Sequence, residues 1–317
     1  MATVSQYPGG FANGITIRGV PLQILHPGKV FWVNNSSVLA PGGIGGSNVN
    51  DGSYLRPFAS IDYAIGRCTA NRGDVIVVMP GHVEVVSAAA GIVWDVAGVA
   101  TVGLGSGTKR PKISFTTAAT ADVDITADNC SFYNLNFQAN FADVTAGIDV
   151  SGVDGLSFDS CYFTEGATDL NFVDTIDLAT GADDISFVNC KFIGNDAAND
   201  SFITGVAHDG FYIDNCYFAM NVAQTAVVGL IETSGNVTNM EIKNSNFRSN
   251  VDGALFLDFN GAANGGVVVW CMFSSIDGAG AVTAGFDLTG AHAFELYVAG
   301  EADSYGIVGG GTAYNNA

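Results

Sequence analysis

Positive charge is scarce in this sequence. Only 11 Lys and Arg residues stand against 31 Asp and Glu residues, and the formal net charge is −20. A surface of this sign repels polyanions, so the composition argues against nucleic-acid binding and against anionic membranes. Charged residues of both signs make up only 13% of the chain, whereas 41 residues are glycine. This balance favours a β-protein with many turns over a helical protein.

Targeting and membrane signals are also lacking. The first residues, MATVSQYPGGFANG, contain neither a basic segment nor an apolar core, so no secretion signal is expected. The most apolar window, residues 88–105, is interrupted by Asp95 and by several glycines, and no membrane-spanning helix is expected there. We therefore expect synthesis in a cytoplasm, followed by use there or release by lysis.

Cysteines are few, yet most of them recur in one motif. The pattern F-x-N-C-x-F has six near copies, at residues 132–137, 158–163, 187–192, 213–218, 242–247 and 268–273. Its fourth position is occupied by Leu135, Cys161, Cys190, Cys216, Ser245 and Cys271, at spacings of 26, 29, 26, 29 and 26 residues. Such regular self-similarity indicates a repeat architecture.

Each repeat reads as short strands separated by turns. The motif alternates apolar and polar residues up to a break near its asparagine, which suggests one strand with a bend. A turn cluster precedes each motif, and before that cluster lies another short strand, as in residues 147–150, 175–178, 230–233, 256–259 and 285–288. Strands at this period predict the coils of a parallel β-helix. A leucine-rich repeat would show a leucine skeleton, and a WD40 blade would be longer.

The N-terminal third departs from the repeat. Ser60 is a candidate N-cap for a helix near residues 60–71, which we expect to cover the open end of the solenoid, and residues 75–79 read as a buried strand. We expect residues 1–55 to form an extended anchoring arm, residues 56–299 the β-helix and residues 300–317 a C-terminal tail.

The phrases PFASIDYAI and GDVIVVMPGH, followed by the Asn-Cys-x-Phe coils, resemble the pectin-lyase-like right-handed β-helix superfamily. In particular, they resemble the opening block of β-helix proteins in tailed-phage virions. The resemblance covers roughly residues 50–300. It implies an all-β, right-handed parallel β-helix but little chemistry, because this fold hosts lyases, hydrolases, tailspikes and inert virion parts.

The repeated columns are interpreted as structural. Leu135 and Ser245 replace cysteine within its column, so we expect an inward ladder rather than a zinc site or disulfides. The asparagines at 134, 189, 215 and 244, with Ser160 in the same place, are expected to stack as an amide ladder at the bend. We expect the phenylalanines at the sixth motif position to stack in the core.

Acidic residues recur in the other strand of the repeat. By alternation they form an outward stripe broken near Thr204, comprising Asp149, Asp177, Glu232, Asp258 and Asp287. Three interpretations stay open: a solvated face, a weak Ca²⁺ or Mg²⁺ site, and a carboxylate pair for glycan hydrolysis. The calcium-plus-base pattern of pectate lyases is not met.

The remaining candidates do not form a recognisable site. Tyr162, Tyr212 and Tyr217 are expected to face outward, which suits sugar binding or a subunit interface. The histidines His26, His82, His208 and His292 are scattered, and His82 is expected to cap the Pro-Gly turn before it. No residue is therefore assigned to catalysis, to a metal or to a cofactor, and no cofactor is expected.

The function expected from the resemblance is structural and non-enzymatic. It implies a phage virion protein made in the host cytoplasm, most simply a capsid decoration or cement protein that forms a homotrimer on the major capsid protein or on other virion proteins. The alternatives are a tailspike-like polysaccharide depolymerase and a carbohydrate-binding fibre, for which a surface polysaccharide would be the partner.

Overall fold

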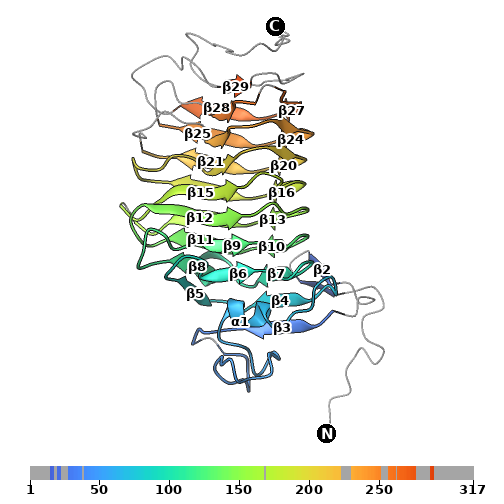
Figure 1. The fold of residues 1–317 in the computed structure, drawn as a ribbon. Helices are drawn as coiled ribbons and strands as arrows, with labels where there is room; N and C mark the ends of the chain where they lie inside the picture. Colours follow the sequence, from blue (N-terminus) through green and yellow to red (C-terminus); the bar gives the residue numbers. More distant parts are fainter. Residues whose placement is uncertain are drawn as a thin grey trace.

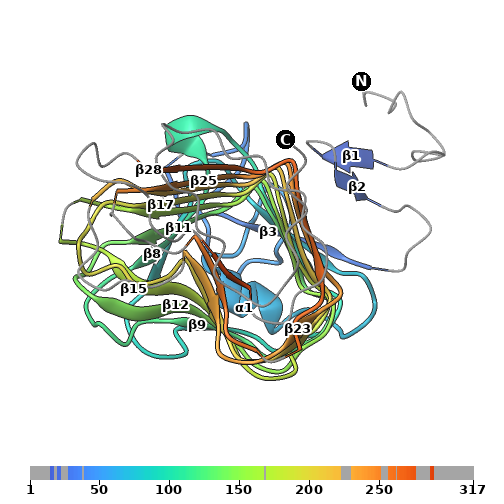
Figure 2. The same ribbon diagram turned by 90° about the horizontal axis from the view of Figure 1, so that it is seen from above.

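The computed structural model describes residues 15–17, 20–22, 28–37, 39–167, 169–222, 230–250, 256–261, 263–275 and 286–288. Three parallel sheets form the walls of a β-helix (Figure 1). Viewed from its C-terminal end, the chain passes counterclockwise from sheet to sheet as it rises toward the viewer, which makes the β-helix right-handed (Figure 2). The predicted right-handed parallel β-helix is therefore confirmed.

From β4 onward, each coil contributes one strand to each sheet, and β3 adds a ninth strand to sheet 1. Sheet 1 contains β3 (Val30–Val33), β4 (Val75–Val78), β7 (Ala100–Gly103), β10 (Ser131–Tyr133), β13 (Ser157–Asp159), β16 (Ile185–Val188), β20 (Phe211–Asp214), β24 (Met240–Lys243) and β27 (Gly266–Val269). Sheet 2 contains β5 (Val83–Val86), β8 (Lys112–Phe115), β11 (Asn136–Ala139), β14 (Tyr162–Glu165), β17 (Lys191–Gly194), β21 (Tyr217–Met220), β25 (Asn246–Ser249) and β28 (Met272–Ser275).

Sheet 3 carries the strands with the acidic stripe. It contains β6 (Ile92–Trp94), β9 (Val123–Ile125), β12 (Val144–Val150), β15 (Phe172–Leu178), β18 (Ile203–Gly205), β22 (Ile231–Thr233), β26 (Leu257–Phe259) and β29 (Phe286–Leu288). Small pairs lie outside these walls: the antiparallel β1 (Ile15–Ile17) and β2 (Val20–Leu22), and the parallel β19 (His208–Asp209) and β23 (Val237–Thr238).

The repeated motif spans a corner rather than one strand. Its first half ends a strand of sheet 1, and its second half begins a strand of sheet 2, so the prediction of a single strand with a bend was wrong. The residue between the halves is left-handed in every copy, with φ of 56° at Asn134, 55° at Asn189 and 57° at Trp270. Asparagine tolerates this conformation better than most residues, which explains its recurrence at the corner.

Stacked aromatic rings fill the core. The predicted phenylalanine column is confirmed, with ring centroids 5.2 Å apart for Phe137 and Phe163 and 4.3 Å apart for Phe163 and Phe192. The stack continues through Phe218, Phe247 and Phe273 at 4.6 to 4.9 Å. Because equivalent residues are paired in register from coil to coil, one side-chain shape is reused along the axis.

A short helix covers the N-terminal end, as predicted. Helix α1 (Ile61–Ile65) begins after Ser60, whose hydroxyl accepts a hydrogen bond from the Tyr63 amide, and it ends at Gly66. It is shorter than the predicted span of 60–71, and a 3-10 turn, η1 (Gly107–Lys109), lies farther along the chain. Neither element is long and apolar enough to cross a membrane, and the described part of the chain contains no other helix.

Within the predicted N-terminal arm, residues 30–33 form a strand of the β-helix instead. Strand β3 pairs in parallel with β4 and extends sheet 1, and the Asn34 amide donates to the Phe58 carbonyl over 2.9 Å. The run Val-Phe-Trp-Val supplies a strand whose Val33 is fully buried, and this overrides the Gly/Asn/Ser-rich surroundings. Residues 1–14 and the predicted tail at 300–317 lie outside the described residues.

Candidate functional site

The acidic stripe follows one register column of sheet 3. Parallel pairing aligns Asp124, Asp149, Asp177, Thr204, Glu232, Asp258 and Asp287. The alignment confirms the predicted column and its break at Thr204, and it adds Asp124 at the N-terminal end. The stripe does not face solvent throughout, because Asp258 is only 9% exposed whereas Asp177 is exposed.

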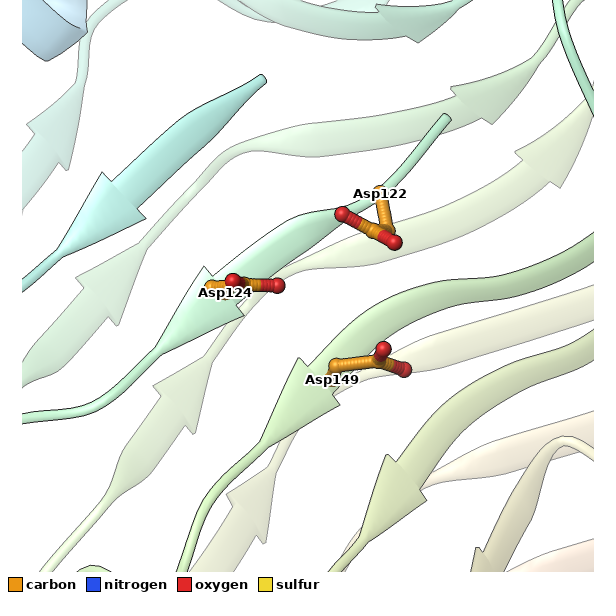
Figure 3. Close-up of side chains that lie close together, drawn as sticks. All are labelled: Asp122, Asp124 and Asp149. Carbon is orange, nitrogen blue, oxygen red and sulfur yellow. The ribbon is translucent and has the colours of Figure 1, made fainter. Parts of the chain in front are cut away.

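Three carboxylates meet at the N-terminal end of this column (Figure 3). Asp122 lies just before β9, Asp124 lies on β9 and Asp149 lies on β12, and one oxygen of each is within 4.8 Å of the others. The Asp149 Oδ1 atom is closed off from solvent and accepts no hydrogen bond from a described residue. Burial, reinforced by the charges of Asp122, Asp177 and Asp124, raises the pKa of Asp149 to about 6.

A second acidic group continues the site along β15. Burial raises the pKa of Asp174 to about 7, and the charges of Asp200, Asp177 and Glu232 add to this increase. The Ser201 amide donates to Asp174 Oδ1 over 3.2 Å, which favours the ionised form but does not outweigh burial. The exposed Asp177 thus lies near two carboxyl groups that hold their protons more tightly than usual.

Basic side chains are absent from this sheet. None of the described strands of sheet 3 contains Lys or Arg, and the sequence has neither between Lys112 and Lys191. Repulsion among the carboxylates is therefore relieved by protonation or by a bound cation. Three carboxylates this close form an oxygen donor set that suits Ca²⁺ or Mg²⁺, and a protonated carboxyl beside an ionised one suits acid–base chemistry.

The cysteine column is part of the core, as predicted. Cys161, Cys190, Cys216 and Cys271 are buried, and all six cysteines are free thiols. Each thiol of the column donates to the backbone, for example from Cys190 Sγ to the Phe158 carbonyl over 3.4 Å. Burial raises the pKa of Cys190 well above its usual value, so this thiol stays protonated and unreactive.

The asparagine ladder is confirmed only in part. Asn215 donates to Asn189 Oδ1 over 2.7 Å, which is the predicted amide-to-amide contact. Elsewhere a carboxylate accepts instead, since Asn189 donates to Asp159 Oδ1 over 3.2 Å and Asn244 donates to Asp214 Oδ1 over 2.8 Å. The Asn134 amide donates to the Gly103 carbonyl over 2.7 Å.

The histidines do not reach the acidic column. His82 is fully buried, accepts from the Asn35 amide over 3.0 Å through Nδ1 and contacts Glu84 Oε2 over 2.7 Å through Nε2. Its side chain therefore links Asn35, just after β3, to Glu84 on β5, which in turn accepts from the Ile61 amide of α1 over 3.0 Å. The side chain does not cap the Pro-Gly turn. His208 is buried and lies 3.0 Å from the Ala182 carbonyl, while His26 and His292 lie outside the described residues.

The predicted outward tyrosines occupy a different edge of the solenoid. Tyr162 and Tyr217 begin strands of sheet 2, and Tyr212 lies on β20, so all three border the corner between sheets 1 and 2. Each has a Lys or Arg near its ring, at distances from 3.6 to 5.9 Å. Figure 2 shows that the corner between sheets 1 and 2 lies across the solenoid from sheet 3. The three tyrosines, which border that corner, are therefore separate from the carboxylates of sheet 3.

Sequence reasoning missed several titratable groups. Asp122 and Asp174 lie outside the repeated strand position, and only the folding of the coils brings them to the stripe. Glu165 was also missed. It is buried at the end of β14, it accepts hydrogen bonds from the Asn195 amide over 2.6 Å and from the Asn199 side chain, and burial raises its pKa to about 7. The available signal was a carboxylate at an inward position of a strand.

Comparisons with known proteins do not assign the chain to a family. No protein-family model and no curated protein matches the chain. A solved structure described as a rhamnogalacturonan lyase is 14% identical and superposes with a TM-score of 0.41, over 76% of this chain and 74% of that chain.

Proposed function

We propose that the protein is a non-enzymatic structural component of a phage virion, a decoration or cement protein that forms a homotrimer on the capsid and binds the major capsid protein. One observation carries the proposal: the thiols and imidazoles of the described coils are used inside the fold. The thiols of Cys161, Cys190 and Cys216 form a core ladder, and the imidazoles of His82 and His208 are buried.

The construction of the solenoid supports a mechanical role. Phenylalanine rings stack from Phe137 to Phe273, and strand pairing continues in register through all three sheets. Because each coil contacts only its neighbours, opening any one of them exposes two apolar faces. A stiff rod of this kind suits a protein that must survive outside the cell on a shell.

Quantitative mass spectrometry of purified virions tests the proposal. We expect the chain in hundreds of copies per particle, and we expect purified protein to rebind expanded capsids that lack it. A few dozen copies or fewer would assign it to the tail instead. Its absence from virions, or failure to bind capsids, would refute a decoration role.

A second candidate, a polysaccharide depolymerase, is favoured by one pair of carboxyl groups. Asp149 and Asp177 are paired in register on adjacent coils, about 4.8 Å apart along the axis, and a retaining glycosidase places its carboxyl groups about 5 Å apart. Asp149, with its pKa raised to about 6, would be the acid and Asp177 the nucleophile.

Digestion of capsular and lipopolysaccharide glycans decides between the two candidates. The depolymerase hypothesis requires cleavage by the native protein and its loss in Asp149→Asn and Asp177→Asn. Asp159→Asn, at the opposite corner, serves as a matched control that should retain activity. Cleavage that survives both site substitutions would exclude these carboxylates as the catalytic pair.

A further inference from the structure

One edge of the solenoid carries no protruding loop. From β10 to β28, only two residues separate the strand of sheet 1 from the strand of sheet 2 in each coil, from residues 134–135 to residues 270–271. The links from sheet 2 to sheet 3 contain at least four residues, and those from sheet 3 to sheet 1 at least five. Figure 2 shows the coils turning the first corner along nearly one path. This corner, here named the ridge, therefore lets a flat surface pack on either side of it.

The two faces that meet at the ridge differ in charge. The described strands of sheet 2 point three cations outward and no carboxylate, because their two glutamates are buried: Lys112, Lys191 and Arg248, against Glu84 and Glu165. The outward positions of sheet 1 carry three carboxylates and one cation: Asp159, Asp214 and Glu241, against Lys243. Sheet 2 is thus positive and sheet 1 negative.

Exposed apolar side chains gather on the same two faces. Among the large hydrophobic residues exposed after β4 in the described part of the chain, only Val206 and Val222 lie elsewhere. The others lie on sheet 1, on sheet 2 or at the ridge: Val83, Val85, Tyr162, Val267, Trp270 and Met272. Trp270 is 60% exposed and Met272 is 50% exposed. Aromatic residues and methionine are enriched where proteins bind one another.

The two faces also match position by position. Rotation about an axis parallel to the solenoid keeps the coils of two copies level. With the axis just outside the ridge, sheet 2 of one copy lies on sheet 1 of the next, and residues equally far from the ridge come opposite one another.

The resulting pairs are complementary in chemistry. Arg248 of one copy faces Glu241 of the next, since each lies in the same coil and at the same distance from the ridge. By the same rule the phenol of Tyr162 faces Asp159, the phenol of Tyr217 faces Asp214, and Met272 faces Val269. Lys191 faces Val188, whose register partners one coil away are Asp159 and Asp214. None of the described strand positions from β10 to β28 brings two like charges together.

A second copy also supplies carboxylates that are missing near these cations. Within the residues that the structure describes, no carboxylate oxygen lies within 4.0 Å of Arg248 or Lys191. The side chain of Glu241 is 46% exposed and contacts only one cation among these residues, Lys243, at 2.9 Å. Its free oxygen surface can therefore accept from a guanidinium that approaches from outside.

We propose that three copies of the chain pack around an axis just outside the ridge, with sheet 2 of each copy on sheet 1 of the next. The inference rests on the proposed function for the number of copies, and it assigns the surface that joins them. The three contacts are identical and the ring closes. A contact between sheet 2 and the acidic sheet 3 would instead bring the loops between those sheets into the interface.

Sedimentation of the full-length chain over a range of concentrations tests this interface. We expect a particle of three chains of 32.7 kDa each. Arg248→Glu and Glu241→Arg should each raise the dissociation constant of the particle at least about tenfold, because each places like charges in all three contacts. The double variant restores opposite charges and should return to within about threefold of the native protein.

Asp154→Lys is the matched control, because it changes the net charge as much as Glu241→Arg does but lies at the exposed turn between sheets 3 and 1. It should assemble like the native protein, and thermal unfolding of each variant checks that the fold is kept. A monomer at every concentration, single variants that assemble like the native protein, or a double variant that recovers nothing would overturn the interface. Growth into open-ended chains would also overturn it, since the contact would then not close.

Capsid binding separates this inference from the proposed function. A solution trimer with the expected charge-swap behaviour that fails to bind capsids would refute the decoration role and keep the interface. A chain that binds capsids as a monomer would refute the interface alone.

Discussion

The Asn215 side-chain amide donates a 2.7 Å hydrogen bond to Asn189 Oδ1, one coil below it. Both residues are left-handed, with φ of 53° and 55°. The bond therefore joins two corners that turn the chain in the same way, and it fixes their spacing along the axis.

Replacing Asn215 by valine should lower the free energy of unfolding by about 2 kcal/mol, because the substitution removes the bond and puts a β-branched residue at a left-handed position. Asn215→Gly loses the bond but relieves the strain, so it should cost less. Urea denaturation of both variants measures the difference. Equal stability of the two variants would show that the backbone conformation is not what asparagine provides.

Cys190 should tolerate serine but not aspartate. Ser245 already occupies the column, where its hydroxyl donates to the Lys243 carbonyl over 2.8 Å and accepts from the Cys216 amide over 3.1 Å. Cys190→Ser can make equivalent bonds and should cost less than about 1 kcal/mol, whereas Cys190→Asp buries an unpaired charge and should cost about 3 kcal/mol or more. Equal losses in chemical denaturation would give the thiol a role beyond packing.

The protein should be more stable at pH 5 than at pH 8. The pKa values of Asp149, Asp174 and Glu165 are raised in the folded chain to between about 6 and 7, from ordinary values near 4. The folded state therefore binds more protons than the unfolded state in that window, and the free energy of unfolding falls as pH rises through it. His208, whose pKa is lowered by burial, opposes this trend with a single group.

Urea unfolding at several pH values tests that trend, and Asp174→Asn should flatten it while raising stability at pH 8. Lowered pKa values, such as that of Asp74, act only at lower pH, where stability is lost as these groups take up protons. A free energy of unfolding that rose steadily from pH 5 to pH 8 would contradict the assignment.

His82→Leu should destabilise the N-terminal end by about 3 kcal/mol. The change leaves the Asn35 amide without its acceptor and leaves Glu84, only 8% exposed, with the Ile61 amide as its remaining described donor. Hydrogen exchange should show the loss first in β3 and α1. Val85→Ser, on the exposed face of β5 beside Glu84, should change stability by less than about 0.5 kcal/mol and serves as the control.

The repeat predicted the coil because its structural positions recur at almost fixed spacing. The residues equivalent to Cys190 and Phe192 are buried in every copy of the motif, and the residue equivalent to Asn189 has a left-handed backbone in every copy. One motif therefore specifies both the core and the corner. The acidic column was predictable for the same reason. The fifth motif position also held a signal, since it reads Tyr162, Lys191 and Tyr217 in successive coils.

Residues outside the repeat were harder to predict. Arg110 reaches Tyr162 from a corner loop of an earlier coil, and Asp122 meets Asp149 only after the chain has turned once around the solenoid. Strand β3 was missed because its partner β4 lies 45 residues away and the intervening segment has no repeat. These contacts depend on loop lengths and coil closure, which local patterns do not encode.

The carboxylates of sheet 3 and the cations at the corner between sheets 1 and 2 lie on different sides of the solenoid. This separation of charge gives the described coils an electric dipole moment perpendicular to the long axis. A negatively charged surface exerts a torque on such a rod as well as a force. The torque turns the corner that carries Arg110 and Lys191 toward that surface before contact, and the acidic wall away from it.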